Sequence, residues 1–223
     1  MKIRFCPYLL KIIVVSFFIG TFTLTSYSQS ADFKSLTDSE EMALIEKIKK
    51  SSNTTSSIKC DFIQNKKLSF LKDLDVSTGV MYYKNSQKLR WEYKSPNPYV
   101  FVLNQSKIYL QNPQGVSSYN TNSNRIYKAI SELIIGFING QGLQSNTNFK
   151  SAFFSNNKQI FVKLTPVNSD IKKLFSSVYL YLDINSYIAS KIVMNESSGD
   201  VTTLSLYNIK RNSTISDDIF ILK

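Results

Sequence analysis

The sequence contains no histidine, which removes much of the catalytic and metal-binding chemistry available to proteins. Without an imidazole there is no Ser-His-Asp or Cys-His machinery and no histidine-ligated metal site. The chain has only seven glycines, and they form neither a phosphate-binding loop nor a dinucleotide-binding pattern. We therefore expect a protein that is not an enzyme and uses no cofactor or metal. An enzyme with a carboxylate pair that meets only in space is the alternative left open.

Cysteine is nearly absent as well, since the chain has two. Cys6 lies in an N-terminal segment that we expect to be removed, which leaves Cys60 without a partner for an intrachain disulfide. Cys60 alternates with Ile58 and Phe62 on a predicted strand, and this placement favours an inert thiol in the core. Stability must then come from burial of apolar side chains.

The N-terminus has the parts of a cleavable export signal. Lys2, Arg4 and Lys11 come ahead of an apolar run, Ile12 to Leu24. Ser26 and Ser28 then place small side chains at alternate positions. We expect a signal peptide over 1–28 and an exported protein in the periplasm. The run is shorter than the roughly 20 residues that span a membrane, and a retained anchor is the alternative. Cys6 precedes the run, which disfavours a lipid-anchored form.

Acidic residues are outnumbered, and the formal net charge is +11. Such an excess can favour nucleic acid, an anionic membrane surface or an acidic partner. The basic residues are scattered in short groups, such as Lys47, Lys49 and Lys50, and form no cluster typical of nucleic-acid binding. We interpret the charge mainly as a solvated surface and expect no nucleic-acid partner.

The rest of the chain, 29–223, is predicted to be one domain that begins with a helix and continues mostly as strands. Thr37 and Glu40 have the spacing of a capping box, and the helix is expected to end near Lys50. Its apolar face is predicted at Met42, Ile45 and Ile48, with Leu44 beside them. Strand-like patterns include Ile58–Phe62, Val80–Tyr82, Leu89–Tyr93, Tyr99–Leu103, Lys107–Gln111, Gln159–Thr165, Ser177–Asp183, Ile188–Asn195, Val201–Lys210 and Ile219–Leu222.

A helical pattern interrupts the strands between Ile126 and Ile138, and Gly140 and Gly142 can end it. Its apolar residues recur at helical spacing and are Ile126, Ile130, Leu133, Ile134, Phe137 and Ile138. We expect this helix and the N-terminal helix to cover the open side of a curved sheet, because a sheet with one buried face needs such cover.

Aromatic residues are the abundant feature, with 13 tyrosines and 15 phenylalanines. Many alternate along the predicted strands between Tyr82 and Tyr207. One interpretation is an ordinary sheet core, since tyrosine favours strands and can keep its hydroxyl in water. The other is a curved sheet whose concave face leaves space for an acyl chain.

The order of several short motifs resembles the LolA/LolB-like family of periplasmic lipoprotein carriers, from about Ile45 to Leu222. The motifs are Ile58–Gln64, Gly79–Tyr82, Arg90–Tyr93 followed by Pro96, Lys107–Pro113, Leu164–Pro166 and Ile215–Phe220. The predicted helix around 131–139 stands where family members have a lid helix. Each motif is weak alone, and the order and spacing carry the resemblance.

The resemblance implies a mainly β (α+β) fold, an incomplete, strongly curved antiparallel β-barrel closed by lid helices. It also implies a monomer that carries lipoproteins from an inner-membrane lipoprotein-releasing transporter to an outer-membrane acceptor. The alternatives are a carrier of another lipid and a sensor or interaction protein with the same fold. The expected cavity and lid residues are Phe62, Met81, Tyr83, Trp91, Tyr93, Phe101, Tyr109, Ile130, Leu133, Ile134, Phe137 and Phe161.

The chain departs from the family pattern ahead of Arg90. Family members commonly carry an arginine there that latches the lid, and Asn85 stands at the corresponding place in this sequence. Asparagine has a shorter reach and makes neutral contacts, whereas arginine makes several charge-assisted bonds. We therefore expect a loosely held lid.

Overall fold

The computed structural model describes residues 33–71, 73–85, 87–121, 135–136 and 141–222. Their strands are β1 (Lys34–Ser35), β2 (Ser57–Lys67), β3 (Leu74–Lys84), β4 (Lys88–Ser95), β5 (Tyr99–Asn104), β6 (Lys107–Asn112), β7 (Gly115–Asn120), β8 (Phe149–Ser155), β9 (Gln159–Pro166), β10 (Phe175–Asp183), β11 (Ala189–Glu196) and β12 (Val201–Arg211). The helices are α2 (Asp38–Asn53) and α4 (Ser169–Lys172), with the 3-10 helices η2 (Gln141–Leu143) and η3 (Asp217–Phe220).

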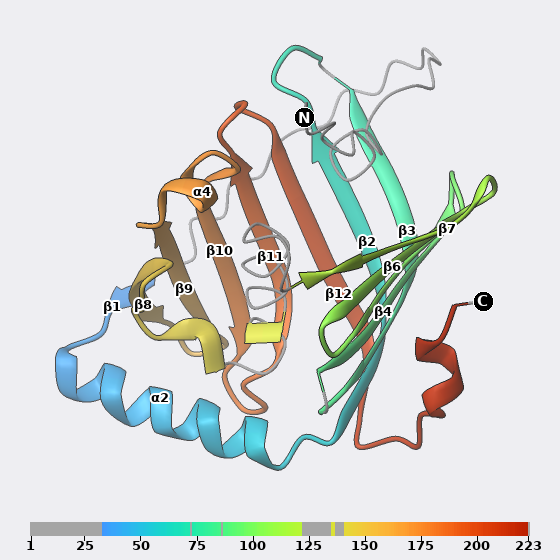
Figure 1. Cartoon of the computed structure of the whole chain (residues 1–223). Coiled ribbons are helices and arrows are strands. Elements are labelled where there is room, and N and C mark those ends of the chain that lie inside the picture. Colours follow the sequence, from blue (N-terminus) through green and yellow to red (C-terminus); the bar gives the residue numbers. More distant parts are fainter. Residues whose placement is uncertain (1–32, 72, 86, 122–134, 137–140, 223) are drawn as a thin grey trace. The chain divides into compact units, whose positions relative to one another are not determined.

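The strands form a 12-stranded antiparallel sheet in the order β1-β8-β9-β10-β11-β12-β2-β3-β4-β5-β6-β7. Two meanders, β2 to β7 and β8 to β12, meet where β12 pairs with β2. The sheet is strongly curved and open (Figure 1), which confirms the predicted mainly β, incomplete antiparallel barrel. Closure by a lid helix stays a prediction, because the 126–138 segment lies outside the described residues except for the helical Ile135 and Gly136.

Most of the predicted strands are present. Buried and less buried residues alternate along them, as the sequence pattern indicates. The predicted strand Ile219–Leu222 is wrong: Asp217–Phe220 form the 3-10 helix η3. The sequence interpretation also missed β7 and β8. In β7, five of six side chains are exposed, so the sequence of this strand shows little alternation of apolar and polar residues.

Helix α2 begins as predicted, with Thr37 as N-cap. The Glu40 amide donates to the Thr37 hydroxyl and the Thr37 amide donates to the Glu40 carboxylate, which completes a capping box. It continues to Asn53 rather than ending near Lys50. The side chains of Thr54 and Thr55 donate to the Ser51 carbonyl at 2.9 and 2.8 Å, which satisfies an acceptor that the end of a helix otherwise leaves free. The buried face is Ile45, Ile48 and Ser52, whereas Met42 is 64% exposed, contrary to the prediction.

Helix α2 runs across one end of strands β8 to β11 (Figure 1). The Ser51 hydroxyl donates to the Ser186 carbonyl in the β10–β11 turn at 2.8 Å. Arg211, at the end of β12, donates to the Ser51 carbonyl at 3.0 Å and to the Thr55 hydroxyl. The β10–β11 turn and the end of β12, both far from α2 in sequence, therefore hold the helix on the sheet.

The 3-10 helix η3 covers one face of strands β3 to β5 (Figure 1). Phe220 and Ile215 pack against Val102, with Tyr82 and Tyr109 at the border of this cluster. The motifs Arg90–Tyr93 and Ile215–Phe220 meet here, since Arg90 donates to the Ile219 carbonyl at 2.9 Å. We call this face of the sheet the outer face and the opposite one the inner face.

Among the described residues, no helix is long and apolar enough to cross a membrane.

Candidate functional site

Two adjacent rows of side chains cross the inner face. In the first row, Cys60 pairs with Met81, Met81 with Trp91 and Trp91 with Phe101 in successive antiparallel registers. In the second row, Leu206 pairs with Phe62, Phe62 with Gly79 and Gly79 with Tyr93. Because strand side chains alternate between faces, residues so paired lie on the same side. The inner face is therefore apolar and aromatic across β12, β2, β3, β4 and β5.

Gly79 makes room for the central aromatic cluster. A side-chain carbon at Gly79 would lie 2.5 Å from Phe62 Cζ and would also clash with the Glu92 carbonyl oxygen. The fully buried Phe62 ring instead lies 5.0 Å from both the Trp91 and the Tyr93 rings, at angles of 46° and 78°. Such tilted and edge-on pairs are favourable for aromatic rings. The glycine of the Gly79–Tyr82 motif thus has a steric reason.

A small apolar cavity adjoins this cluster on the inner face. Its volume is about 10 Å³, which corresponds to about one water molecule. It is lined by Ile58, Cys60, Met81, Trp91, Ile188, Ala189, Ile192, Leu206 and Ile209. Burial raises the pKa of the Cys60 thiol to about 12, so the thiol stays protonated and unreactive, as the sequence analysis predicted.

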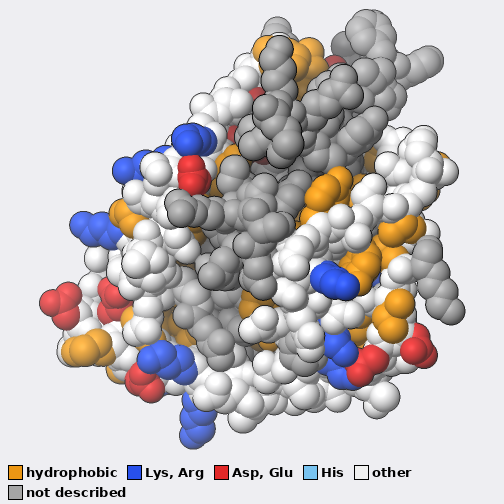
Figure 2. All heavy atoms as spheres, in the orientation of Figure 1, with side chains coloured by type: hydrophobic (Ala, Val, Ile, Leu, Met, Phe, Trp, Pro, Cys, Tyr) orange, Lys and Arg blue, Asp and Glu red, His pale blue; other side chains and the backbone are white. Residues whose placement is uncertain are grey.

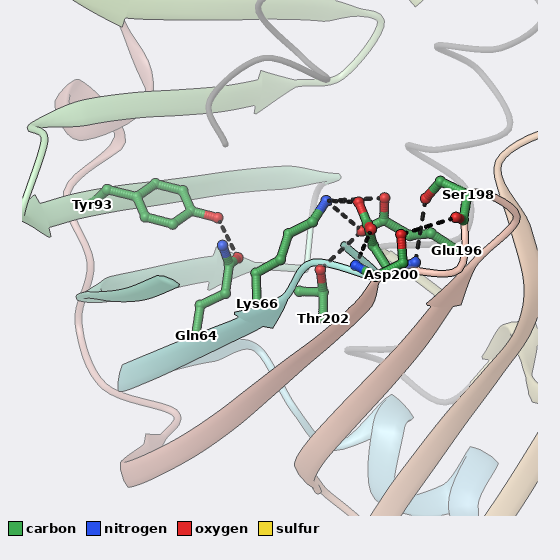
Figure 3. Close-up of polar contacts among 8 residues, drawn as sticks. Gln64, Lys66, Tyr93, Glu196, Ser198, Asp200 and Thr202 are labelled. Carbon is green, nitrogen blue, oxygen red and sulfur yellow. Dashed lines mark hydrogen bonds and ion pairs between the residues drawn. The ribbon is translucent and has the colours of Figure 1, made fainter. Parts of the chain in front are cut away.

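The inner face becomes polar toward the β2–β3 and β11–β12 hairpins (Figure 3). The Tyr93 hydroxyl donates to Gln64 Oε1 at 2.8 Å, and burial raises the pKa of the Tyr93 phenol. Two residues along β2, Lys66 Nζ lies 2.8 Å from Glu196 Oε1 and 3.5 Å from Asp200 Oδ2. The Lys66 side chain is only 3% exposed. An isolated buried ammonium is very unfavourable, so the Lys66 ammonium depends on the two carboxylates to stabilise it in this buried position.

Asp200 is held by further bonds in this polar cluster. The Ser69 amide donates to Asp200 Oδ1 at 2.8 Å, and this bond is the main cause that lowers the Asp200 pKa below its ordinary value. The Thr202 hydroxyl donates to Glu196 Oε1 at 2.9 Å. The cluster thereby connects strands β2, β11 and β12 and the start of the β2–β3 loop.

Six of the expected cavity residues lie on the inner face: Phe62, Met81, Tyr83, Trp91, Tyr93 and Phe101. Four expected lid residues, Ile130, Leu133, Ile134 and Phe137, lie outside the described residues. The inner face also contains residues that the sequence analysis did not select, notably Leu206 and Ile192. The alternation of Leu204 with Leu206, and of Ile192 with Met194, could have identified them.

The structure does not bring Tyr109 and Phe161 to the inner face. Tyr109 pairs with Val102 and borders the cluster under η3. Phe161 lies on the outer face, since its neighbours Ile160 and Val162 are the residues of β9 that are buried on the inner side. The aromatic character of both residues and the family resemblance predict an inner position, whereas strand parity decides the face. We leave them out of the candidate site.

Phe161 instead occupies the middle of an outer aromatic cluster. Its ring lies 5.5 Å from Phe33, 5.4 Å from Phe154, 5.5 Å from Tyr179 and 5.2 Å from Tyr181. Lys191 Nζ lies 3.9 Å from the centre of the Tyr181 ring, a favourable cation–π distance.

Charged side chains do not form a field of one sign on the face seen in Figure 2, where Lys and Arg alternate with Asp and Glu. In the part of the chain that the structure describes, no group of three or more acidic or cysteine side chains could hold a metal ion.

The fold and the inner face together define an open, curved-sheet protein with an apolar face on one side. The chain belongs to the LolA family: the model of the outer membrane lipoprotein carrier protein LolA matches residues 53–223. A curated outer-membrane lipoprotein carrier protein of Idiomarina loihiensis is 27% identical over 189 residues, which cover 85% of this chain and 86% of that protein.

Two solved structures are similar at low sequence identity. The MucA/MucB complex structure from Pseudomonas aeruginosa aligns with TM-score 0.50 and 9% identity, over 82% of this chain and 61% of that one. A LolA superfamily protein from Nitrosomonas europaea aligns with TM-score 0.44 and 11% identity, over 81% of this chain and 97% of that one. At such identities the similarity concerns the fold alone.

Proposed function

We propose that this protein is a carrier that binds the acyl chains of lipoproteins on the inner face of its sheet. The observation that supports this best is the continuous apolar surface formed by Phe62, Met81, Trp91 and Phe101 with Leu206 from the other meander. Each buried methylene of an acyl chain is worth about 0.8 kcal/mol, so such a surface can lower the cost of moving acyl chains through water without covalent chemistry.

The size of the cavity sets a condition on this function. A volume of about 10 Å³ holds about one water molecule and not an acyl chain. We propose that side chains of the inner face move apart when an acyl chain binds. We propose that the 126–138 segment is the lid that moves, with Ile130, Leu133, Ile134 and Phe137 contacting the ligand.

The same proposal includes export and transfer between membranes. Removal of residues 1–28 would place the carrier in the periplasm, between a transporter that releases lipoproteins and an acceptor at the outer membrane. N-terminal sequencing of the exported protein should begin at Gln29, and recovery of Met1 would contradict this localisation.

An exposed apolar hairpin supports contact with a membrane or an acceptor. Phe70 is 75% exposed, and Leu71, Leu74 and Val76 are each about half exposed, at 48%, 49% and 48%. Phe70 and Leu71 lie in the loop after β2, and Leu74 and Val76 lie at the start of β3. Exposed apolar groups of this kind often mark interaction sites.

The test of the carrier function is acyl binding to protein that has been purified from the periplasm. Native mass spectrometry with lipid extraction should detect bound lipid, and delipidated protein should take up a fluorescent acyl probe. A protein that is empty and takes up no probe would be an interaction or sensor protein with the same fold.

Quenching of Trp91 fluorescence by a bromine-labelled fatty acid places the bound chain. Trp91 is the only tryptophan, so quenching should follow saturation of the site. The matched control is the double variant Trp91→Phe/Tyr207→Trp. Tyr207 is 40% exposed and pairs with Asp61 on the outer face, next to the inner Leu206. Quenching that is equal in both proteins would place the acyl chain elsewhere.

A further inference from the structure

Trp91 carries a polar atom on the inner face that the protein leaves without a partner. Its indole nitrogen, Nε1, is shielded from solvent, and no acceptor for it is found in the structure as far as it is described. Buried polar groups nearly always have a hydrogen-bond partner, and buried tryptophan N–H groups usually find one. An exception of this kind calls for an explanation.

The neighbouring residues supply no acceptor because they are almost entirely apolar. Met81 and Phe101 flank Trp91 in the strand register, and the Phe62 ring lies 5.0 Å away. The cavity beside Trp91 has the volume of about one water molecule, but a buried water needs two to four polar partners. Apart from Trp91, the lining side chains offer only two weakly polar sulfur atoms, the thiol of Cys60 and the thioether of Met81.

Tyr93 shows the contrasting case on the same face and strand. Its hydroxyl donates to Gln64 Oε1 at 2.8 Å, so this donor is satisfied within the protein. The nearest buried cation along β2, Lys66, is already engaged by Glu196 and Asp200. Among the described residues of these two rows, Trp91 Nε1 is therefore a neutral N–H donor that is left for a ligand.

We propose that Trp91 Nε1–H donates a hydrogen bond to a carbonyl oxygen of the ligand's acyl ester or amide, and so sets the depth at which the acyl chain lies. This inference rests on the proposed carrier function and specifies the ligand's chemistry. A neutral carbonyl suits the position better than a free carboxylate, because a buried charge without a counter-ion is strongly unfavourable.

The experiment uses a 15N-labelled protein, in which the one tryptophan gives one indole N–H cross peak. It is titrated with a 1-monoacylglycerol and with the 1-alkyl glycerol ether of the same chain length, which differs by lacking the carbonyl. We expect the ester to move the indole proton downfield, and the ether to bind with no such shift. Equal shifts with both ligands would overturn the proposal.

A second arm uses Trp91→Phe, which keeps an aromatic ring and removes the donor. Displacement of a fluorescent acyl probe should show ester affinity about fivefold lower in the variant and ether affinity within about twofold of wild type. Equal losses for both ligands would mean that Trp91 contributes only apolar contact, and would overturn the inference while leaving the carrier function intact. Failure of both ligands to bind wild-type protein overturns the carrier function and this inference together.

Discussion

Replacing Lys66 by methionine removes the buried ammonium and leaves the Glu196 and Asp200 carboxylates without the cation that they share. Lys66 Nζ lies 2.8 Å and 3.0 Å from the two Glu196 oxygens and 3.5 Å from Asp200. At an effective dielectric constant of about 20, a unit charge pair at 2.8 Å attracts by about 6 kcal/mol, and desolvation of the ions offsets much of this. Breaking a buried pair typically costs about 3–5 kcal/mol.

The two carboxylates keep some solvent contact, at 17% exposure for Glu196 and 13% for Asp200, which reduces the expected cost. We expect Lys66→Met to lower the free energy of unfolding by about 2–4 kcal/mol. Urea titration measured by Trp91 fluorescence and by circular dichroism gives this value. Lys67→Met is the matched control, because it removes the same charge from an exposed neighbour and should change stability by no more than about 0.5 kcal/mol.

The reasoning is refuted if Lys66→Met and Lys67→Met have the same effect, or if the loss for Lys66→Met is below about 1 kcal/mol. A cycle with Glu196→Gln separates the direct interaction from other effects. We expect a coupling energy of at least about 1 kcal/mol between the two positions. Additive effects would mean that the ion pair seen in Figure 3 contributes little to stability.

Three further perturbations test other contacts. Gly79→Ala places a methyl group 2.5 Å from Phe62 Cζ and should destabilise the fold by about 1–3 kcal/mol in urea titrations, whereas wild-type stability would show that the strand can shift freely. Hydrogen bonds from Lys84 and Lys88 lower the pKa of the Asp217 carboxyl. The contribution of Asp217 to stability is therefore present above about pH 4 and is lost as the pH falls through the lowered pKa of the folded state. Asp217→Asn should therefore lower the urea midpoint at about pH 7 but not at about pH 2, with Asp218→Asn as the control. Asn85→Arg should slow uptake of an acyl probe if position 85 latches the lid, and unchanged kinetics would place closure elsewhere.

Local patterns in the sequence were sufficient for the elements that local interactions decide. Thr37 and Glu40 specify the start of α2, because the capping box uses only residues within one helical turn. Alternation specifies strands such as β2 and β10, since burial of one face imposes a period of two. The bond from Arg211 to the Ser51 carbonyl joins the end of α2 to β12, and no local pattern could show a contact between residues so distant in sequence.

The sequence by itself determined the class of fold and the burial of Cys60. Only the tertiary structure decided which face each aromatic residue occupies, because the strands around Tyr109 and Phe161 have apolar residues at both parities. It also decided that Lys66 is buried against Glu196 and Asp200, and that Trp91 Nε1 has no described acceptor. Those facts depend on which strands lie side by side, and strand pairing over such sequence separations results from packing of the whole sheet and not from any local pattern.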